Sequence, residues 1–191
     1  MSARWRAMFV VPLIVLALGA AFGAVGYLLE ITLGIPHRFE MPWAVRSGGV
    51  AVLGLGLGIL GWLWKYRKPG DVLVSTYVTM RKAVCRTPSE EGVARTEPLV
   101  LEGPQRHVRH PMYFAVVVLL LGWWLVFDHT FILWMAFFFF LWFNLVVIRF
   151  EEAELTALYG QRYAAYVKAV PKFVPSLRPR WPPAEANVIG K

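Results

Sequence analysis

The stretch MYFAVVVLLLGWWLVFDHTFILWMAFFFFLWFNLVVI (112–148) contains two apolar runs separated by the polar pair Asp128 and His129. Each run is close to the roughly 20 residues that an α-helix needs to cross about 30 Å of hydrocarbon. The polar pair leaves room only for a tight turn, so we predict that the runs 112–127 and 130–148 form an antiparallel pair of membrane-spanning helices. The two ends far from the turn then lie on the same side of the membrane.

Two further apolar runs, 8–29 and 44–64, precede this pair. Hydrophobic residues make up 58% of the chain and charged residues only 17%, and the apolar residues stand in long blocks, which excludes an ordinary soluble domain. The first run follows basic residues, as a signal peptide does, but it is longer than a typical signal-peptide core, so we expect it to be retained. The run LGLGLG (53–58) is typical of close helix packing, although glycine also admits a cofactor near the backbone.

The predicted fold class is an all-α polytopic membrane protein with about four transmembrane helices and with cytoplasmic interfacial helices that form a pocket. The predicted regions are an N-terminal two-span helical hairpin (1–70), a cytoplasmic interfacial helix and loop (71–100), a core of span three, span four and a post-span helix (101–175), and a disordered tail (176–191).

Basic residues lie mainly on one side of the predicted spans. The connection 65–109 carries nine Lys and Arg and residues 149–191 carry seven, whereas the other side has only Arg38 and Arg46. By the positive-inside rule, both termini and the long connection face the cytoplasm. The expected location is the plasma membrane of a bacterium or archaeon, or the endoplasmic reticulum of a eukaryote. The net charge of +8 favours contact with anionic membrane lipids, and we do not expect nucleic-acid binding.

Two helices are predicted at the cytoplasmic surface. The first covers 71–86, and its expected apolar face is formed by Leu73, Tyr77, Met80 and Val84. The second covers 151–170, where apolar and aromatic residues recur at helical spacing, and it is expected to stop at Pro171.

Polar side chains gather at both ends of the hairpin that face the cytoplasm. RHVRHPMY (106–113) precedes span three, and Arg149, Glu151 and Glu152 follow span four, so the two groups meet at one end. Arginine and tyrosine at such places are often membrane anchors. Carboxylates at a helix exit sit badly near the negative end of the helix dipole and need partners or a ligand. The histidines at 107 and 110 have no obvious third partner, so no metal site is expected.

The segments GPQRHVRHPMY (103–113) and EEAELTALYGQRYAAYVKAVPKFVP (151–175) resemble the isoprenylcysteine carboxyl methyltransferase family and the related phospholipid methyltransferases. The shared order is Gly-Pro, Arg-His-Pro-x-Tyr, Glu-Glu-x-x-Leu, aromatic-Gly-x-x-Tyr-x-x-Tyr and Val-Pro-x-x-x-Pro, with the membrane hairpin between the second and third elements. The resemblance covers about residues 101–175, and the first two spans match only as generic helices.

This resemblance implies an integral membrane enzyme that uses S-adenosylmethionine as its methyl donor and takes a lipophilic acceptor from the bilayer. In that reading Glu151 and Glu152 bind the ribose hydroxyls or the ammonium group of the cofactor, and Tyr163, Tyr166 and Lys172 close the pocket. The complete set of residues implied in cofactor binding is Arg109, His110, Tyr113, Glu151, Glu152, Tyr163, Tyr166 and Lys172.

The sequence departs from the family pattern at four positions, where the family often has Tyr, Gly, a basic residue and Arg. The residues found there are Gln105, Ala115, Val147 and Lys172, and the nearest basic residue to the glutamate pair is Arg149. The catalytic candidates are Arg149, Glu152 and His110.

Several acceptors and functions remain open from the sequence. An isoprenylcysteine carboxylate or a small thiolate needs little acid–base help, whereas a phospholipid amine needs a base such as Glu152 or His110. The alternatives of another class are a small four-span transporter and a non-catalytic binding protein. A transporter is disfavoured because the acidic candidates Glu30 and Asp128 fall at the ends of predicted spans. The sequence does not predict the oligomeric state.

Overall fold

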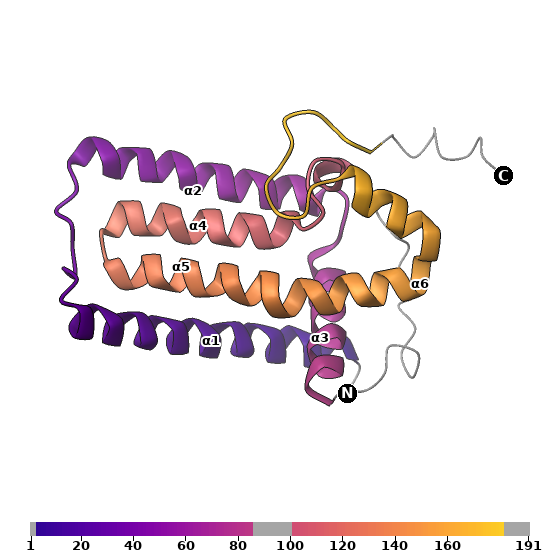
Figure 1. Ribbon diagram of the computed structural model, residues 1–191, viewed down its shortest axis with the longest axis horizontal. Helices are drawn as coiled ribbons and strands as arrows, with labels where there is room; N and C mark the ends of the chain where they lie inside the picture. The colour runs from indigo at the N-terminus through magenta and orange to yellow at the C-terminus, as the bar shows by residue number, and fades with distance from the viewer. Residues whose placement is uncertain (1–2, 86–100, 182–191) are drawn as a thin grey trace.

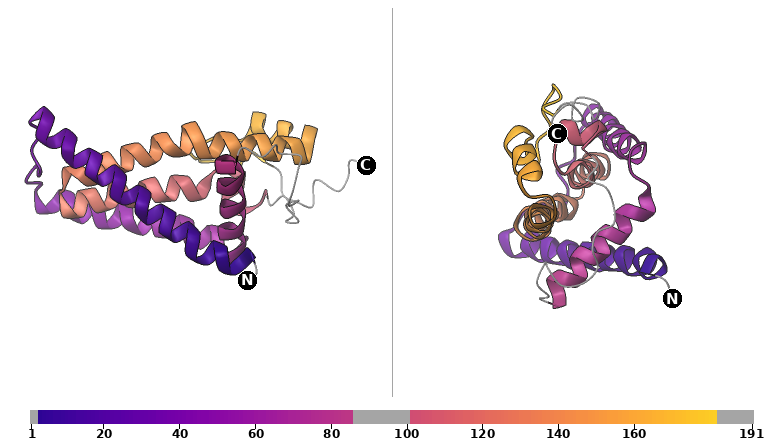
Figure 2. Two further views of the ribbon diagram at one scale, coloured as in Figure 1. Left: turned by 90° about the horizontal axis from the view of Figure 1, so that it is seen from below. Right: turned by 90° about the vertical axis from the view of Figure 1, so that its right-hand side faces the viewer.

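The computed structural model describes residues 3–85 and 101–181. Within these residues the chain is all helical, and the helices in order are α1 (Ala3–Leu33), α2 (Trp43–Trp64), α3 (Pro69–Cys85), η1 (Gly103–Arg106), α4 (Pro111–Phe127), α5 (Thr130–Trp142), η2 (Phe143–Val147) and α6 (Ile148–Ala169). The long helices α1, α2, α4 and α5 run side by side, and α3 crosses them at one end of the bundle (Figures 1 and 2). We refer to the end with α3, η1 and α6 as the site end, and to the opposite end as the turn end.

The lengths and composition of these helices confirm the predicted all-α membrane fold. Three helical stretches are long and apolar enough to cross a membrane, Trp5–Leu33, Trp43–Trp64 and Thr130–Ala169, and Pro111–Phe127 is a shorter apolar helix. The third stretch joins α5, η2 and α6 over 40 residues and forms a continuous rod up to a kink at Gly160. At 1.5 Å per residue the part before the kink is about 45 Å long, which exceeds the hydrocarbon thickness of about 30 Å. The part from about residue 149 onward therefore projects beyond the membrane at the site end.

The first two helices lie on opposite sides of the central pair. α1 packs against α5, α5 against α4, and α4 against α2, so α1 and α2 form the two outer members of the bundle (Figure 1). Residues 1–70 thus form an open pair of spans with the central pair between them, and the connection 34–42 crosses the turn end (Figure 1). Hydropathy defines each span, but it does not define which spans are neighbours.

Glycines allow α2 and α4 to approach closely. A Cβ atom at Gly56 would lie 2.7 Å from the Leu119 side chain, and one at Gly49 would lie 2.7 Å from that of Leu125. Gly54 and Gly58 instead face open space. The close-packing interpretation of the run 53–58 is thus confirmed for Gly56, whose face of the helix contacts α4.

Hydrogen bonds close the turn end. Asp128 adopts left-handed backbone geometry (φ 58°), and its fully buried carboxylate accepts hydrogen bonds from the amides of Phe39 and Met41 at 3.1 and 2.9 Å. Glu30 lies 2.7 Å from the Nδ1 atom of His37. Both acidic residues that could have marked a transport path therefore bind the loop that connects α1 to α2.

The surface helices and the tail differ in detail from the predictions. On α3 the buried side chains are Val72 and Ser75, whereas Leu73 is only half-buried. The side chains of Met80 and Val84, and the predicted loop after α3, lie outside the described residues.

The predicted post-span helix continues directly from span four and ends at Ala169, with a kink at Gly160 (φ 50°). Residues 176–181 are not disordered, because the amides of Ser176 and Arg180 donate to the carbonyls of His107 and Arg106. The remaining tail, 182–191, lies outside the described residues.

Candidate active site

The two polar groups of the hairpin meet in one cluster at the site end. The Nη1 atom of Arg109 lies 2.6 Å from Oε1 of Glu152, and Nε2 of His110 lies 3.0 Å from the same oxygen. On the other side of the imidazole, Nδ1 of His110 lies 3.5 Å from Oε2 of Glu151. The hydroxyl of Tyr113 donates to that Glu151 oxygen at 3.1 Å. The hairpin therefore places both glutamates against the Arg-His-Pro-x-Tyr turn.

The backbone around His110 sets the direction of these side chains. His110 precedes α4 as its N-cap residue, with φ −121° and ψ 64°, and Pro111 occupies the first helical turn, where its missing N–H costs nothing. The amide of Arg109 donates to the carbonyl of Pro171 at 2.9 Å. The segment after α6 thereby holds the turn in place from outside.

Burial and charge shift the acidities within the cluster. The His110 side chain is only 5% exposed, and burial lowers its pKa, but the hydrogen bonds and charges of Glu151 and Glu152 outweigh burial and raise the pKa above 6.5. Burial raises the pKa of Glu152, but His110, Arg109 and Lys172 together lower it below 4.5. The cluster is therefore most stable with the glutamate ionised and the imidazole protonated.

The π-helical turn η2 packs against the cluster through Tyr113. Tyr113 stacks on Phe143, the first residue of η2, with ring centroids 4.7 Å apart, and on the imidazole of His110 at 5.8 Å. Lys172 donates to the carbonyl of Asn144 in the same turn at 3.3 Å. Isolated π turns are frequent at functional sites because they redirect the side chains that follow.

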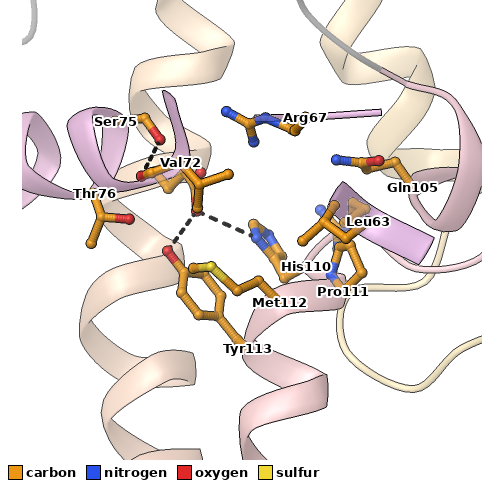
Figure 3. A pocket seen from close by; sticks show the side chains of 12 residues that line it. Leu63, Arg67, Val72, Ser75, Thr76, Gln105, His110, Pro111, Met112 and Tyr113 are labelled. Atoms are coloured by element: carbon orange, nitrogen blue, oxygen red, sulfur yellow. Dashed lines mark hydrogen bonds and ion pairs between the residues drawn. The ribbon is translucent and has the colours of Figure 1, made fainter. Parts of the chain in front are cut away.

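The cluster borders an open cleft with an enclosed volume of about 40 Å³. Figure 3 shows His110, Pro111, Met112 and Tyr113 on one wall, while α3 supplies Val72, Ser75 and Thr76. Arg67, Gln105, Arg109 and Glu151 also line the cleft.

Four of the residues predicted for cofactor binding line this cleft, namely Arg109, His110, Tyr113 and Glu151. Glu152 contacts two of them, Arg109 and His110. The structure thus brings together the turn before α4 and the glutamate pair.

Among the other predicted residues, Tyr163 hydrogen-bonds to Arg109 and Lys172 lowers the pKa of Glu152, so both adjoin the cluster without lining the cleft. Tyr163 and Tyr166 are 1% and 2% exposed and form a core with Leu101 and Val170, and the hydroxyl of Tyr166 donates to the carbonyl of Gln105 at 2.7 Å. Burial raises the pKa of both tyrosines. Arg149 is exposed on α6, because two residues before Glu151 correspond to about 200° of helical rotation.

The sequence interpretation missed Arg67, Ser75, Thr76 and the position of Gln105. Ser75 falls on the face of α3 opposite to the predicted apolar stripe, where it is buried, and Thr76 falls between that face and the stripe. Arg67 stands between Lys65 and Lys68 and is indistinguishable in sequence from a membrane anchor. Gln105 could have been identified, because it lies within the Gly-Pro-x-Arg segment next to the cluster.

Comparison with known proteins points to one family. A family model described as phospholipid methyltransferase matches residues 52–162, which is more than half of the 191 residues. The matched range includes α4, α5, the turn before α4 and both glutamates. Searches of curated proteins and of solved structures found no match. Among the described residues, no group of three or more His, Cys, Asp or Glu side chains is placed to hold a metal ion.

Proposed function

The chain belongs to the phospholipid methyltransferase family, and on that premise we propose that it transfers a methyl group from S-adenosylmethionine to a lipophilic acceptor at the membrane surface. The observation that carries the proposal is the convergence of the Arg-His-Pro-x-Tyr turn and the Glu151–Glu152 pair beside one cleft. The contacting residues, His110 with Glu152 and Tyr113 with Glu151, are 42 and 38 positions apart in the sequence. They lie where the helical stretch of α5, η2 and α6 is expected to leave the membrane.

The side chains present fit S-adenosylmethionine. Among the described residues, Nε of Arg109 is buried without a hydrogen-bond partner, which suits the carboxylate of the amino-acid part of the cofactor. Glu151 and Glu152 offer carboxylate oxygens to its ammonium group or ribose hydroxyls.

The cofactor, when bound, supplies an electrophilic methyl group: a lone pair of the acceptor forms the new bond to carbon while the C–S electron pair returns to sulfur. The protein aligns the two partners and excludes water, and alignment of this kind can contribute about 7–11 kcal/mol. A site at the edge of the bilayer, lined by the apolar side chains of Leu63, Val72 and Met112, is suited to both tasks.

The acidities in the cluster favour an anionic acceptor over an amine. A general base must be able to take a proton near neutral pH. Glu152 has a lowered pKa, which makes it a weaker base, and His110 has a raised pKa, which increases the share of its protonated form. An isoprenylcysteine carboxylate or another lipid-bound anion needs no base and is our first choice, and a phospholipid amine is the second.

We also propose that the site end faces the cytoplasm, because the basic residues gather there. Maleimide labelling of the single cysteine, Cys85, in vesicles of known sidedness tests this orientation.

The proposed activity is tested with methyl-labelled S-adenosylmethionine and protein in nanodiscs supplied with total lipid extract. We expect label in the lipid fraction with the wild-type protein, and none with His110→Ala, because this change removes the group that links both glutamates. Wild-type protein that neither binds the cofactor by calorimetry nor labels lipid contradicts the proposal.

A further inference from the structure

One wall of the cleft is not part of the cluster, and it carries a cation. Arg67 follows the end of α2, lines the cleft and is half-buried, whereas its neighbours Lys65 and Lys68 are exposed. Exposed lysines beside a span are typical membrane anchors. A guanidinium that turns into a cleft is instead placed to bind a ligand, since its planar fork matches the oxygens of carboxylates and phosphates.

Gln105 faces the same space with an unsatisfied acceptor atom. Its side chain is 6% exposed, and its Oε1 atom is buried without a hydrogen-bond partner within the described residues. The chain around it is fixed: Gly103 has φ 59° and a Cβ there would collide with the ring of Tyr66, while Tyr166 binds the Gln105 carbonyl. In Figure 3 the carboxamide of Gln105 and the guanidinium of Arg67 lie across His110 from Tyr113. A buried acceptor atom held so firmly needs a donor from a ligand.

The charges in the cleft favour an anion beside Arg67. The two negative charges of the glutamate pair are matched by Arg109 and by His110, whose pKa is raised. Arg67 is a further cation that lines the cleft, and it also interacts within the protein. The cofactor under the proposed function would add one net positive charge, from its sulfonium, ammonium and carboxylate groups. An anionic acceptor offsets this added charge, whereas a cationic acceptor increases it.

We infer that Arg67 and Gln105 form the recognition site for the acceptor, and that the acceptor is a lipid-anchored oxyanion with an N–H donor next to it. Arg67 binds the oxyanion, and the Oε1 atom of Gln105 accepts a hydrogen bond from the N–H group. This chemistry has two sources: the carboxylate and amide N–H of a prenylated cysteine, or the phosphate and ammonium of an aminophospholipid. The inference rests on the proposed function for the identity of the ligand as an acceptor.

Binding of a minimal ligand tests the inference without any turnover. The probes are N-dodecanoylglycine, which has both groups, its methyl ester, which lacks the charge, and N-dodecanoylsarcosine, which lacks the N–H. The readout is the shift of the thermal-unfolding midpoint of protein in nanodiscs of neutral lipid. We expect wild-type protein to bind the glycine derivative at least about tenfold more tightly than either analogue, because a charged hydrogen bond or an unmatched buried acceptor each changes binding by that order.

Variants assign each preference to one side chain. Arg67→Gln should abolish the preference for acid over ester, and Arg67→Lys should restore part of it, since lysine supplies charge without the planar fork. Gln105→Leu should abolish the preference for glycine over sarcosine. Lys65→Gln and Lys68→Gln are the matched controls, and both should behave like wild type. Equal binding of all three probes to wild-type protein, or unchanged preferences in Arg67→Gln and Gln105→Leu, overturns the inference.

Kinetics then identify the source of the oxyanion and separate this inference from the proposed function. Label transfer is measured with an S-prenylated N-acetylcysteine and with vesicles of phosphatidylethanolamine. For whichever acceptor is methylated, Arg67→Gln should raise KM about tenfold or more, while the Kd of S-adenosylmethionine stays within about twofold of wild type. Unchanged KM overturns the acceptor assignment alone. Wild-type protein that does not bind the cofactor overturns the proposed function, while the probe preferences still decide whether Arg67 and Gln105 recognise an oxyanion.

Discussion

Replacing Glu152 with glutamine removes one negative charge from the centre of the cluster and keeps the shape of the side chain. The carboxylate is 24% exposed and contacts Arg109 at 2.6 Å and His110 at 3.0 Å, and these partners are 10% and 5% exposed. Loss of one partner from a fully buried ion pair costs about 3–5 kcal/mol. Partial exposure and the remaining carbonyl of glutamine reduce this cost, so we expect a loss of about 2–3 kcal/mol.

Two measurements check this value. In a protein of this size each kcal/mol corresponds to about 2–4 °C in the unfolding midpoint, so Glu152→Gln should lower the midpoint by roughly 5–10 °C. Calorimetry in nanodiscs should show at least about tenfold weaker binding of S-adenosylmethionine, equal to about 1.4 kcal/mol. Glu40→Gln makes the same chemical change at an exposed residue of the turn end and should alter neither value. A midpoint and a Kd that match the wild type in Glu152→Gln would refute both the energetic importance of the cluster and its role in binding.

Three further predictions concern acidity, packing and the tyrosine core. The pKa of His110 is raised above 6.5, so its contribution to stability is complete below pH 6.5 and is lost as the pH rises through the raised pKa. Between about pH 6 and 9 the unfolding midpoint of the wild type should therefore fall relative to that of His110→Gln. Parallel curves for the two proteins would contradict the shift. Gly56→Ala should destabilise the protein by about 1–3 kcal/mol, because the new methyl group collides with α4. Gly58 faces open space, so Gly58→Ala is the control and should change the unfolding midpoint little. Equal effects of the two substitutions would show that α2 does not pack as described. Tyr166→Phe removes the buried hydrogen bond to the Gln105 carbonyl and should cost about 1–3 kcal/mol in denaturant unfolding. If this tyrosine serves the core and not the pocket, the Kd for S-adenosylmethionine stays close to wild type.

Much of the site could be predicted because short-range and long-range constraints agree. Because of the tight turn at Asp128, the start of α4 and the end of α5 lie at the same end of the hairpin. The two glutamates follow on α6, which continues from α5 through η2. Proline at 111 fixes where α4 begins. These features depend on chain connectivity, which a single sequence contains.

The remaining features depend on neighbours that the sequence does not identify. Tyr163 and Tyr166 have the spacing of an amphipathic helix, but their buried face packs on the segment at Leu101, and Tyr163 reaches the cluster through Arg109. Lys172 contacts a carbonyl of the π turn, and nothing in the local sequence predicts that turn. The face of α3 that packs on the protein, at Val72 and Ser75, is not the predicted apolar stripe, because the partners of α3 include other helices as well as lipid.

The closed turn end has a consequence for how a lipid can reach the site. The loop between α1 and α2 crosses the whole width of the bundle there and is tied to Asp128, so the four long helices are fastened together at that level (Figure 1). If the helices separate to admit an acyl or prenyl chain, the separation is then greatest at the site end, because the turn end is held closed. Under the proposed function, the protein would take its lipophilic acceptor from the leaflet at the site end only, and acceptors in the other leaflet would first have to be flipped.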